Sequence, residues 1–268
     1  MPLPPPREDG TAVVTGASSG IGAAIAGALG ARGYAVTLVA RREERLLGLA
    51  SELAAAHGIR AGVIAADLAE REGRERLARE LERLEMQVDL LVNNAGFGHH
   101  ADFVDAGRER QLEMVALNCE AVVDLCGRYL PPMVAREAGA VINIASTAAF
   151  QPLPGSATYA ASKAFVLSFS EAVHEELKGT GVTVTAVCPG PVRTEFAEVA
   201  GIGGAEDRTP GMLWMSAEDL AEEAVEAAEK GKRAVVPGPL NHAGSILGRH
   251  TPRVISLPLT RRVWRQVT

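Results

Sequence analysis

The sequence predicts an α/β protein with a doubly wound parallel β-sheet, helices on both faces and three αβα layers. Apolar runs of strand length, several nearly continuous in Val, Ile, Leu and Ala, alternate along the chain with helical stretches. Such runs are typical of strands covered on both faces, and the alternation implies right-handed crossovers within one parallel sheet. With 268 residues, one domain can bury its core without disulfides or metals.

The expected elements follow one another in regular order. Strands are expected at residues 11–15, 35–40, 62–66, 88–93, 140–145 and 182–188, with a shorter one at 234–237. The best marked helices are expected at residues 21–32, 43–57, 71–85 and 217–230. The last of these has a start signal of its own, because Ser216 stands three residues before Asp219 in the pattern of a capping box.

Composition argues against several classes of function. Hydrophobic residues make up 47% and charged residues 22% of the chain, as in ordinary globular proteins. The net charge of −6 argues against a nucleic-acid partner, and no apolar run is long enough for a membrane span. The chain start does not resemble a secretory signal, and its 3 scattered cysteines suggest a reducing compartment. We therefore expect a cytoplasmic protein without a metal site.

A glycine-rich segment follows the first strand, where residues 15–22 read TGASSGIG. Glycines at this point allow a tight turn and a close approach to a pyrophosphate, which the N-terminus of the next helix then holds. The coenzyme contacts expected here are Gly16, Ser18, Ser19, Gly20, Ile21 and Gly22. The alternative is a turn that simply needs small residues.

The end of the second strand favours NADP(H) over NAD(H). An NAD site usually offers an acidic residue at this point, whereas this chain has Ala40 followed by Arg41 and Arg42. A guanidinium group matches the geometry of a phosphate and stays charged, so Arg41 is expected to bind the 2′-phosphate with help from Arg42. The alternative for either arginine is a solvated cation at the start of a helix.

Tyr159 and Lys163 are four residues apart, so a helix places both on one face. A free tyrosine has a pKa of about 10, and we expect Lys163, together with an oxidised nicotinamide, to lower it. Ser146 follows a predicted strand at the edge where open α/β sheets bind ligands, and its hydroxyl is suited to hold a substrate oxygen. Taken alone, Tyr-x-x-x-Lys is a weak pattern, since most such pairs are a packed aromatic and an exposed cation.

Together these segments resemble the short-chain dehydrogenase/reductase (SDR) family in its single-domain form, which has a Rossmann-type sheet. The resemblance runs from about Gly10 to Pro237. Seven motifs occur in the order of the family: TGASSGIG at residues 15–22, Asp67-Leu68, NNAG at residues 93–96, Asn118, Ser146, Tyr159 with Lys163, and Pro189-Gly190. We identify the sequence as a member of that family on the whole set.

The resemblance implies a role for each matched residue. In the catalytic tetrad, Asn118 would support a water relay to Lys163, Ser146 would orient the substrate carbonyl, and Tyr159 would be the general acid/base. Lys163 would also bind the nicotinamide ribose. The further coenzyme contacts would be Asp67, Leu68, Asn94, Ala95, Gly96, Tyr159, Pro189, Gly190, Val192 and Thr194.

The chain is expected to divide into three parts. Residues 1–10 would form an extended N-terminal arm, and residues 11–237 the NADP-binding and catalytic domain, with a substrate lid at about 191–215. Residues 238–268 would form a basic extension. The chain from residue 230 onward has no Asp or Glu, and its cations are Lys230, Lys232, Arg233, Arg249, Arg253, Arg261, Arg262 and Arg265.

The basic extension departs from the family pattern and has two interpretations. It packs on the domain or on a neighbouring subunit of a homodimer or homotetramer, or it contacts an anionic partner. A membrane surface and an acidic carrier protein are the anionic partners considered. We favour the first interpretation, because Pro252 and Pro258 interrupt a long amphipathic helix.

Two further groups of residues are left open. His99 and His100 follow NNAG and favour a loop near the pocket mouth over a chemical role, since adjacent histidines are poorly spaced as joint metal ligands. A second group is apolar and would form either a substrate wall for a lipophilic carbonyl or ordinary packing of the lid. Its members are Phe150, Leu153, Phe196, Met212, Leu213, Trp214 and Met215.

The sequence therefore predicts an NADP(H)-dependent carbonyl reductase or alcohol dehydrogenase acting on CH–OH donors (EC 1.1.1.-). It would transfer a hydride between the nicotinamide and a small, lipophilic C=O/CH–OH substrate, with reduction as the favoured direction. The alternative within enzymes is a 3-oxoacyl-thioester (ACP/CoA) reductase. A non-catalytic NADP-binding sensor is the alternative of another class, and the intact tetrad argues against it.

Overall fold

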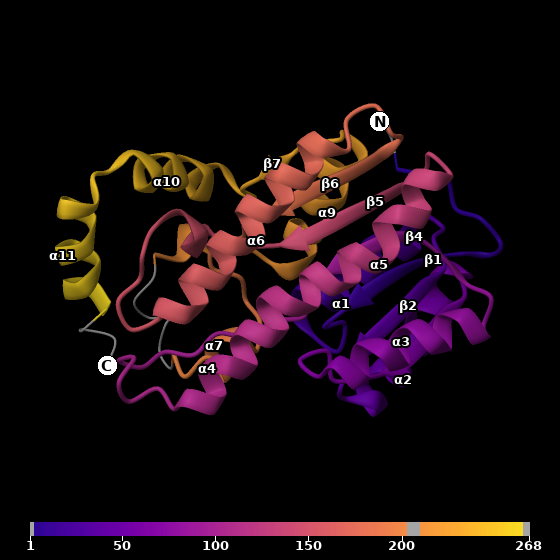
Figure 1. The fold of residues 1–268 in the computed structure, drawn as a ribbon, viewed down its shortest axis with the longest axis horizontal. Coiled ribbons are helices and arrows are strands. Elements are labelled where there is room, and N and C mark those ends of the chain that lie inside the picture. The colour runs from indigo at the N-terminus through magenta and orange to yellow at the C-terminus, as the bar shows by residue number, and fades with distance from the viewer. Residues whose placement is uncertain (1–2, 203–209, 265–268) are drawn as a thin grey trace.

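The computed structural model describes residues 3–202 and 210–264. Within these ranges, seven parallel strands form one sheet in the order β3-β2-β1-β4-β5-β6-β7 (Figure 1). The strands are β1 (Gly10–Thr15), β2 (Val36–Ala40), β3 (Ala61–Ala65), β4 (Gln87–Asn93), β5 (Gly139–Ile144), β6 (Val182–Val187) and β7 (Ala234–Val235). Strand order reverses between β1 and β4, which is the point where sheets of this kind bind ligands. The predicted doubly wound Rossmann-type fold is confirmed.

Helices cover both faces of the sheet. On one face lie α1 (Gly20–Ala31), α2 (Glu43–His57) and α9 (Ala217–Glu229), whose apolar residues share one core cluster. On the other lie α3 (Arg71–Arg83), α5 (Ala121–Ala135) and α6 (Ala157–Glu176), which share a second cluster. Neighbouring residues of β1 pack on opposite faces of the sheet, since Val14 belongs to the first cluster and Val13 to the second. The near-continuous apolar strands therefore reflect burial on both faces.

Shorter elements surround the carboxyl ends of the strands. They are α4 (Arg108–Val115), the π-helix η1 (Ala116–Glu120), the 3₁₀-helix η2 (Thr147–Phe150), α7 (Phe196–Val199) and the 3₁₀-helix η3 (Gly211–Leu213). The C-terminal extension forms α10 (Pro239–His250) and α11 (Arg253–Trp264), drawn in yellow in Figure 1. Because α10 contacts η2 and η3, the extension lies beside the ligand-binding edge of the sheet.

The N-terminal segment lies against the domain. Leu3 is buried, and the Tyr34 hydroxyl donates a hydrogen bond to the carbonyl of Pro4 at 2.6 Å. Arg7 forms an ion pair with the buried Asp89 at 2.9 Å. Gly10 is already the first residue of β1. Residues 1–2 of the predicted arm and 265–268 of the extension lie outside the described ranges.

The expected start of α9 is found with a modified capping pattern. The Ser216 hydroxyl accepts a hydrogen bond from the Asp219 backbone N–H at 3.0 Å and donates one to the Asp219 carboxylate at 2.7 Å. In the described part of the chain, no helix combines the length and apolar character needed to cross a membrane.

Candidate active site

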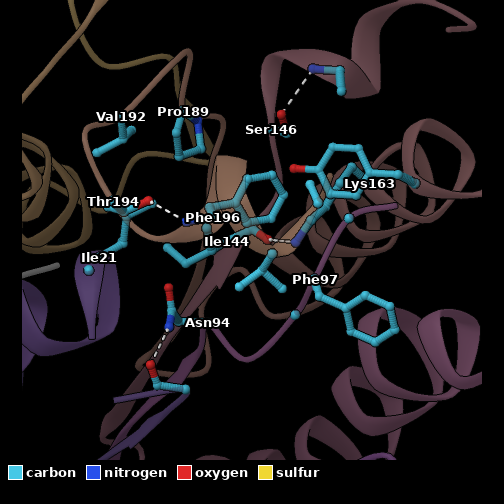
Figure 2. A pocket seen from close by; sticks show the side chains of 18 of the residues that line it. Ile21, Asn94, Phe97, Ile144, Ser146, Lys163, Pro189, Val192, Thr194 and Phe196 are labelled. Carbon is cyan, nitrogen blue, oxygen red and sulfur yellow. Dashed lines mark hydrogen bonds between the residues drawn. The ribbon is translucent and has the colours of Figure 1, made fainter. Parts of the chain in front are cut away.

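A cavity of about 780 Å³ opens at the carboxyl ends of the strands and brings most of the predicted site residues together. Its walls include Gly16, Ser18, Ser19, Gly20, Ile21, Arg41, Arg42, Asp67, Leu68, Asn94, Ala95, Gly96, Ser146, Tyr159, Lys163, Pro189, Gly190, Val192 and Thr194. Gly22 and Asn118 lie behind these walls. Figure 2 shows Ser146 and Lys163 at one end of the pocket and Ile21, Asn94 and Thr194 at the other.

The glycine-rich turn has the geometry of a phosphate cradle. Gly16 has φ +65°, in the left-handed region that favours glycine. A Cβ on Gly22 would lie 2.5 Å from the carbonyl oxygen of Gly16, so a side chain at that position would not fit. Among the described residues, the side chain of the N-cap Ser19 makes no capping hydrogen bond to α1. The N–H groups of its first turn therefore suit an anionic ligand, and the residues present fit the pyrophosphate of a dinucleotide.

Hydrogen bonds fasten the NNAG segment to this turn. The Thr15 hydroxyl accepts from the backbone N–H groups of Asn94 and Ala95, both at 3.0 Å. The Asn94 side chain donates to the Thr15 carbonyl at 2.9 Å. The end of β4 is thereby held against the end of β1, where the strand order reverses.

Arg41 and Arg42 both line the cavity but differ in their contacts. Arg41 is exposed and pairs with Asp67 at 3.4 Å. Arg42 lies directly on the glycine-rich turn, because its Nη2 donates to the hydroxyls of Ser18 at 2.9 Å and Ser19 at 2.7 Å. Both guanidinium groups are therefore at the cleft, and Arg42 is the more firmly placed.

The Asp67-Leu68 turn rests on a buried arginine that the sequence analysis did not single out. Arg74 is 2% exposed and donates to the carbonyls of Leu68 at 3.0 Å and Ala69 at 3.1 Å. Its charge is balanced by Asp124 at 2.8 Å and by Glu120. An arginine in a helix of alternating charges gives no sign in the sequence that it will be buried.

Tyr159 and Lys163 stand one turn apart on α6, close to the end of β5. Lys163 is buried, its Nζ donates to the carbonyl of Ile144 at 2.8 Å, and it lies 5.9 Å from the centre of the Tyr159 ring. The Ser146 hydroxyl accepts from the Ala148 N–H at 3.1 Å, at the start of η2, and Ser146 is near enough to Tyr159 to lower the pKa of the phenol. The phenol, the ammonium and the hydroxyl thus converge on one wall.

The predicted lowering of the Tyr159 pKa is not what these side chains produce. Burial raises the pKa of Tyr159 to about 12, while the hydrogen bond with Ser146 acts in the opposite direction. Burial also lowers the pKa of Lys163 to about 8. The expectation was wrong for the protein groups alone because the environment that brings Lys163 near Tyr159 also excludes the water that would stabilise a phenolate.

Asn118 lies in the π-helix η1, a type of distortion that is frequent at functional sites. Its Oδ1 accepts from the Phe97 N–H at 3.2 Å, and its Nδ2 donates to the Phe97 carbonyl and to the Ser162 hydroxyl, both at 3.0 Å. A Cβ on Gly96 would lie 2.8 Å from the Asn118 Oδ1 and 3.4 Å from the Lys163 Nζ. Asn118 therefore stands next to the ammonium group, with Gly96 leaving space between them.

The described parts of the predicted lid lie across the cavity. Val192 forms an isolated parallel bridge with Met215, and the Phe196 ring packs on the Tyr159 ring with centroids 5.5 Å apart. A Cβ on Gly20 would lie 2.9 Å from the Thr194 Cγ2, so this loop also touches the glycine-rich turn. Residues 203–209 of the predicted lid lie outside the described ranges.

Sequence analysis missed one wall of the cavity altogether. The C-terminal helix α10 contributes Leu240, Asn241, Gly244, Ser245 and Gly248. The available signal was their spacing, since residues four apart share one helical face and three of the five are Gly or Ser. A second omission is Glu195, which lines the cavity beside Thr194.

The structure shows where the two histidines and the apolar residues lie whose roles the sequence did not decide. His99 lines the cavity with its Nδ1 3.1 Å from the Gln111 Nε2, and the His100 Nδ1 lies 3.2 Å from the Ser156 hydroxyl. Within the described ranges, no group of three His, Cys, Asp or Glu is arranged as metal ligands. Of the apolar group, Phe150, Leu153, Phe196, Leu213 and Trp214 line the cavity, whereas Met212 and Met215 line a neighbouring hollow of about 410 Å³.

Fold and site together define a Rossmann-type α/β protein with a Ser, Tyr and Lys cluster at the ligand edge of its sheet. The family model described as short chain dehydrogenase matches residues 10–201. The chain therefore belongs to the short-chain dehydrogenase/reductase family.

Individual relatives support this assignment. A very-long-chain 3-oxoacyl-CoA reductase of Anas platyrhynchos is 38% identical over 194 residues, which are 70% of this chain and 62% of the relative. This chain thus spans less than two thirds of that relative's length. A short-chain dehydrogenase from Sphingobium yanoikuyae in complex with NADPH is 31% identical, with TM-score 0.79, over 91% of this chain and 96% of the other. A 7beta-hydroxysteroid dehydrogenase structure is 26% identical, with TM-score 0.83, over 100% and 99%.

Proposed function

We propose that the chain is an NADP(H)-dependent carbonyl reductase that converts a lipophilic ketone or aldehyde to the alcohol, with Tyr159 as the general acid. The observation that carries this proposal is the convergence of Ser146, Tyr159 and Lys163 on one wall of a cavity whose other end is a phosphate cradle. The preference for NADP(H) rests on Arg41 and Arg42 at the cleft and on the neighbour from Sphingobium yanoikuyae, which binds NADPH.

The site offers a partner for each part of the coenzyme. The first turn of α1 would hold the pyrophosphate, Arg42 and Arg41 the 2′-phosphate, and Asp67-Leu68 the adenine. Lys163 would bind the nicotinamide ribose, and Val192 and Thr194 would lie beside the ring. When bound, the nicotinamide supplies the hydride for reduction of the substrate carbon or accepts it in the reverse direction.

The side chains of the site then have distinct tasks. Ser146 holds the carbonyl oxygen of the substrate, and Tyr159 donates a proton to that oxygen as it gains charge. A Tyr159 pKa of about 12 keeps the phenol protonated at neutral pH, which suits a proton donor in the reductive direction. The Ile144 carbonyl fixes the Lys163 ammonium in place. Asn118 stands beside Lys163, where it would support a relay of protons from water.

The apolar walls favour a lipophilic substrate. Phe150, Leu153, Phe196, Leu213 and Trp214 surround the cavity, with further lining from α10. The match to the structure named as a 7beta-hydroxysteroid dehydrogenase covers 100% of this chain, so it takes in the C-terminal extension as well. A 3-oxoacyl-thioester reductase is the second candidate, favoured by the curated relative that acts as a very-long-chain 3-oxoacyl-CoA reductase.

We also propose a homodimer or homotetramer in the cytoplasm. Apolar side chains of α4, α5 and α6 stand exposed on the outer helical layer, among them Leu112, Val115, Val123 and Phe165. A second copy of the chain would cover them, and removing these apolar side chains from water would stabilise the assembly. For the basic extension, contact with the domain or a neighbouring subunit is favoured over an anionic membrane or an acidic carrier protein. The apolar and small residues of α10 that face the cavity support this choice.

The test is NADPH oxidation, followed by absorbance, against a panel of ketones, aldehydes, quinones and acyl thioesters, with NADH in parallel. Tyr159→Phe should lower the turnover rate by at least about 10²-fold and leave NADPH binding intact. Tyr129→Phe is the matched control: it removes another buried hydroxyl, for which the described structure shows no hydrogen-bond partner. Wild-type turnover in Tyr159→Phe would overturn the mechanism. NADPH binding without turnover of any substrate would favour the sensor alternative.

A further inference from the structure

A carboxylate of the loop after β6 pairs with two arginines at the mouth of the coenzyme cleft. The Glu195 Oε2 accepts from the Arg42 Nη1 at 2.9 Å, and its Oε1 accepts from the Arg45 Nη1 at 2.6 Å. Arg42 precedes α2 and Arg45 lies in its first turn, so these contacts tie the loop to that helix. The hydrogen bonds from Arg45 and Arg42 lower the pKa of Glu195 to about 2, so its charge is present at neutral pH.

The Arg42 guanidinium is shared between this loop and the glycine-rich turn. Its Nη2 donates to the hydroxyls of Ser18 and Ser19, while its Nη1 faces Glu195. All four residues line the same cavity. An anionic group that approaches Arg42 from the cavity therefore meets a guanidinium that already has a carboxylate partner.

The second arginine at the cleft also has a carboxylate partner, but a weaker one. Arg41 lies 3.4 Å from Asp67 and 3.6 Å from Glu113. Charge-assisted hydrogen bonds are normally about 2.7–2.9 Å long, so only the pair of Arg42 with Glu195 has that length. Glu195 therefore competes more strongly with a phosphate for Arg42 than Asp67 and Glu113 do for Arg41.

We propose that Glu195 is a coenzyme-specificity residue, which competes with the 2′-phosphate of NADP(H) for Arg42 and so limits the preference for NADP(H) over NAD(H). The inference rests on the proposed coenzyme site. A 2′-phosphate must take Arg42 from Glu195 or lie close to its negative charge, whereas the 2′-hydroxyl of NAD(H) carries no charge to be repelled. The competition therefore acts on one coenzyme and not on the other.

The loop can release Arg42 without leaving the cleft. Glu195 uses a different oxygen for Arg45, so that contact persists when Arg42 turns to a phosphate. The flanking residues have contacts of their own, since Thr194 lies against Gly20 and Phe196 packs on Tyr159. Glu195→Gln keeps the size and shape of the side chain, removes its charge and leaves one acceptor oxygen, which can still bind Arg45. It therefore tests the negative charge that faces Arg42 with little change in the packing of the loop.

The experiment measures the affinities of NADPH and NADH by fluorescence titration at low and at high salt. Glu195→Gln should tighten NADPH binding about two- to fivefold, the range of one exposed ion pair, and leave NADH unchanged. The difference should shrink at high salt, because exposed charges are screened. Glu198→Gln is the matched control, an equal change of charge on the exposed side chain three residues further along α7.

A double-mutant cycle distinguishes competition for Arg42 from a general change in the electrostatic potential at the coenzyme site. In an Arg42→Gln background, Glu195→Gln should no longer alter the ratio of NADPH to NADH affinity. An unchanged ratio in the single variant, or equal tightening of both coenzymes, would overturn the inference. The wild-type ratio tests the proposed NADP(H) preference separately. A chain that prefers NADH would overturn that preference, while a ratio raised by Glu195→Gln would still support competition for Arg42.

Discussion

The Phe196 ring packs on the Tyr159 ring at a centroid distance of 5.5 Å and an interplanar angle of 48°. Phe196 is the first residue of α7, in the loop above the cavity, and Tyr159 is the proposed proton donor on α6. A Cβ on Gly98 would lie 2.9 Å from the Phe196 Cζ, so the ring is confined from the NNAG side as well. The position of the loop and that of the phenol are therefore linked by direct contact.

Removal of this contact should affect substrate more than coenzyme. Phe196→Ala takes away an aromatic wall beside Tyr159, and we expect KM for an apolar ketone to rise about tenfold, as for the loss of one apolar contact in a substrate pocket. The Kd of NADPH should stay within about twofold. Phe103→Ala, which removes an exposed ring outside the cavity lining, is the control. An equal loss of coenzyme affinity in Phe196→Ala would contradict a role at the substrate.

Lys163→Met should change how stability depends on pH. Lys163 has an ordinary pKa of 10.5 in the unfolded chain and about 8 in the folded one, because burial disfavours its charge. Between these values the unfolded chain binds more protons, so this lysine makes stability rise with pH from about 8 to 10.5. Tyr159 acts in the opposite sense above pH 10, since burial raises its pKa to about 12.

The measurement is the free energy of unfolding without coenzyme at several pH values from 7 to 10. Lys163→Met should be at least as stable as the wild type at pH 7, and its advantage should shrink as pH rises through 8. Lys178→Met, on an exposed lysine, should run parallel to the wild type. Parallel profiles for Lys163→Met and the wild type would show that the ammonium is not held in an unfavourable environment. Turnover should be lost in Lys163→Met.

Arg74→Ala should destabilise the domain by about 3 kcal/mol, the cost of breaking a buried ion pair from one side. It leaves Asp124 without a partner from α3 and frees the carbonyls of Leu68 and Ala69. Arg71→Ala, on the same helix, removes only an exposed pair with Glu75 and should cost less than about 0.5 kcal/mol. Urea unfolding measures both variants, and similar losses would refute the buried role of Arg74.

Side chains added at Gly244 should select against large substrates. A Cβ there meets none of the described residues within 4 Å, although Gly244 lines the cavity, so contacts with these residues do not require a glycine. Gly244→Ala should stabilise α10 by about 0.5–1 kcal/mol. Gly244→Leu should raise KM for a bulky ketone and leave that for a small aldehyde unchanged. Gly48→Leu, at an equally open position on α2, is the control. A uniform effect on both substrates would argue against a wall formed by α10.

The order of strands and helices was predictable from the sequence, because a strand that is buried on both faces of the sheet has a nearly continuous run of apolar residues. Neighbouring residues such as Val13 and Val14 belong to opposite core clusters, so both must be apolar. The strand ends predicted for β1 to β6 differ from the observed ones by at most one residue. Only β7 is clearly shorter than the predicted 234–237.

The fold, the family and the helical face that carries Tyr159 and Lys163 were predictable from the order of the amino acids, because they depend on local periodicity and fixed spacing. Tertiary structure decided what depends on distant segments meeting. It half-buried Tyr159, and this desolvation raises the pKa of the phenol. It also brought α10 to the cavity and placed Glu195 on Arg42, 153 residues away along the chain. Desolvation and contacts between distant charges have no local pattern, because they exist only once the chain has closed around the site.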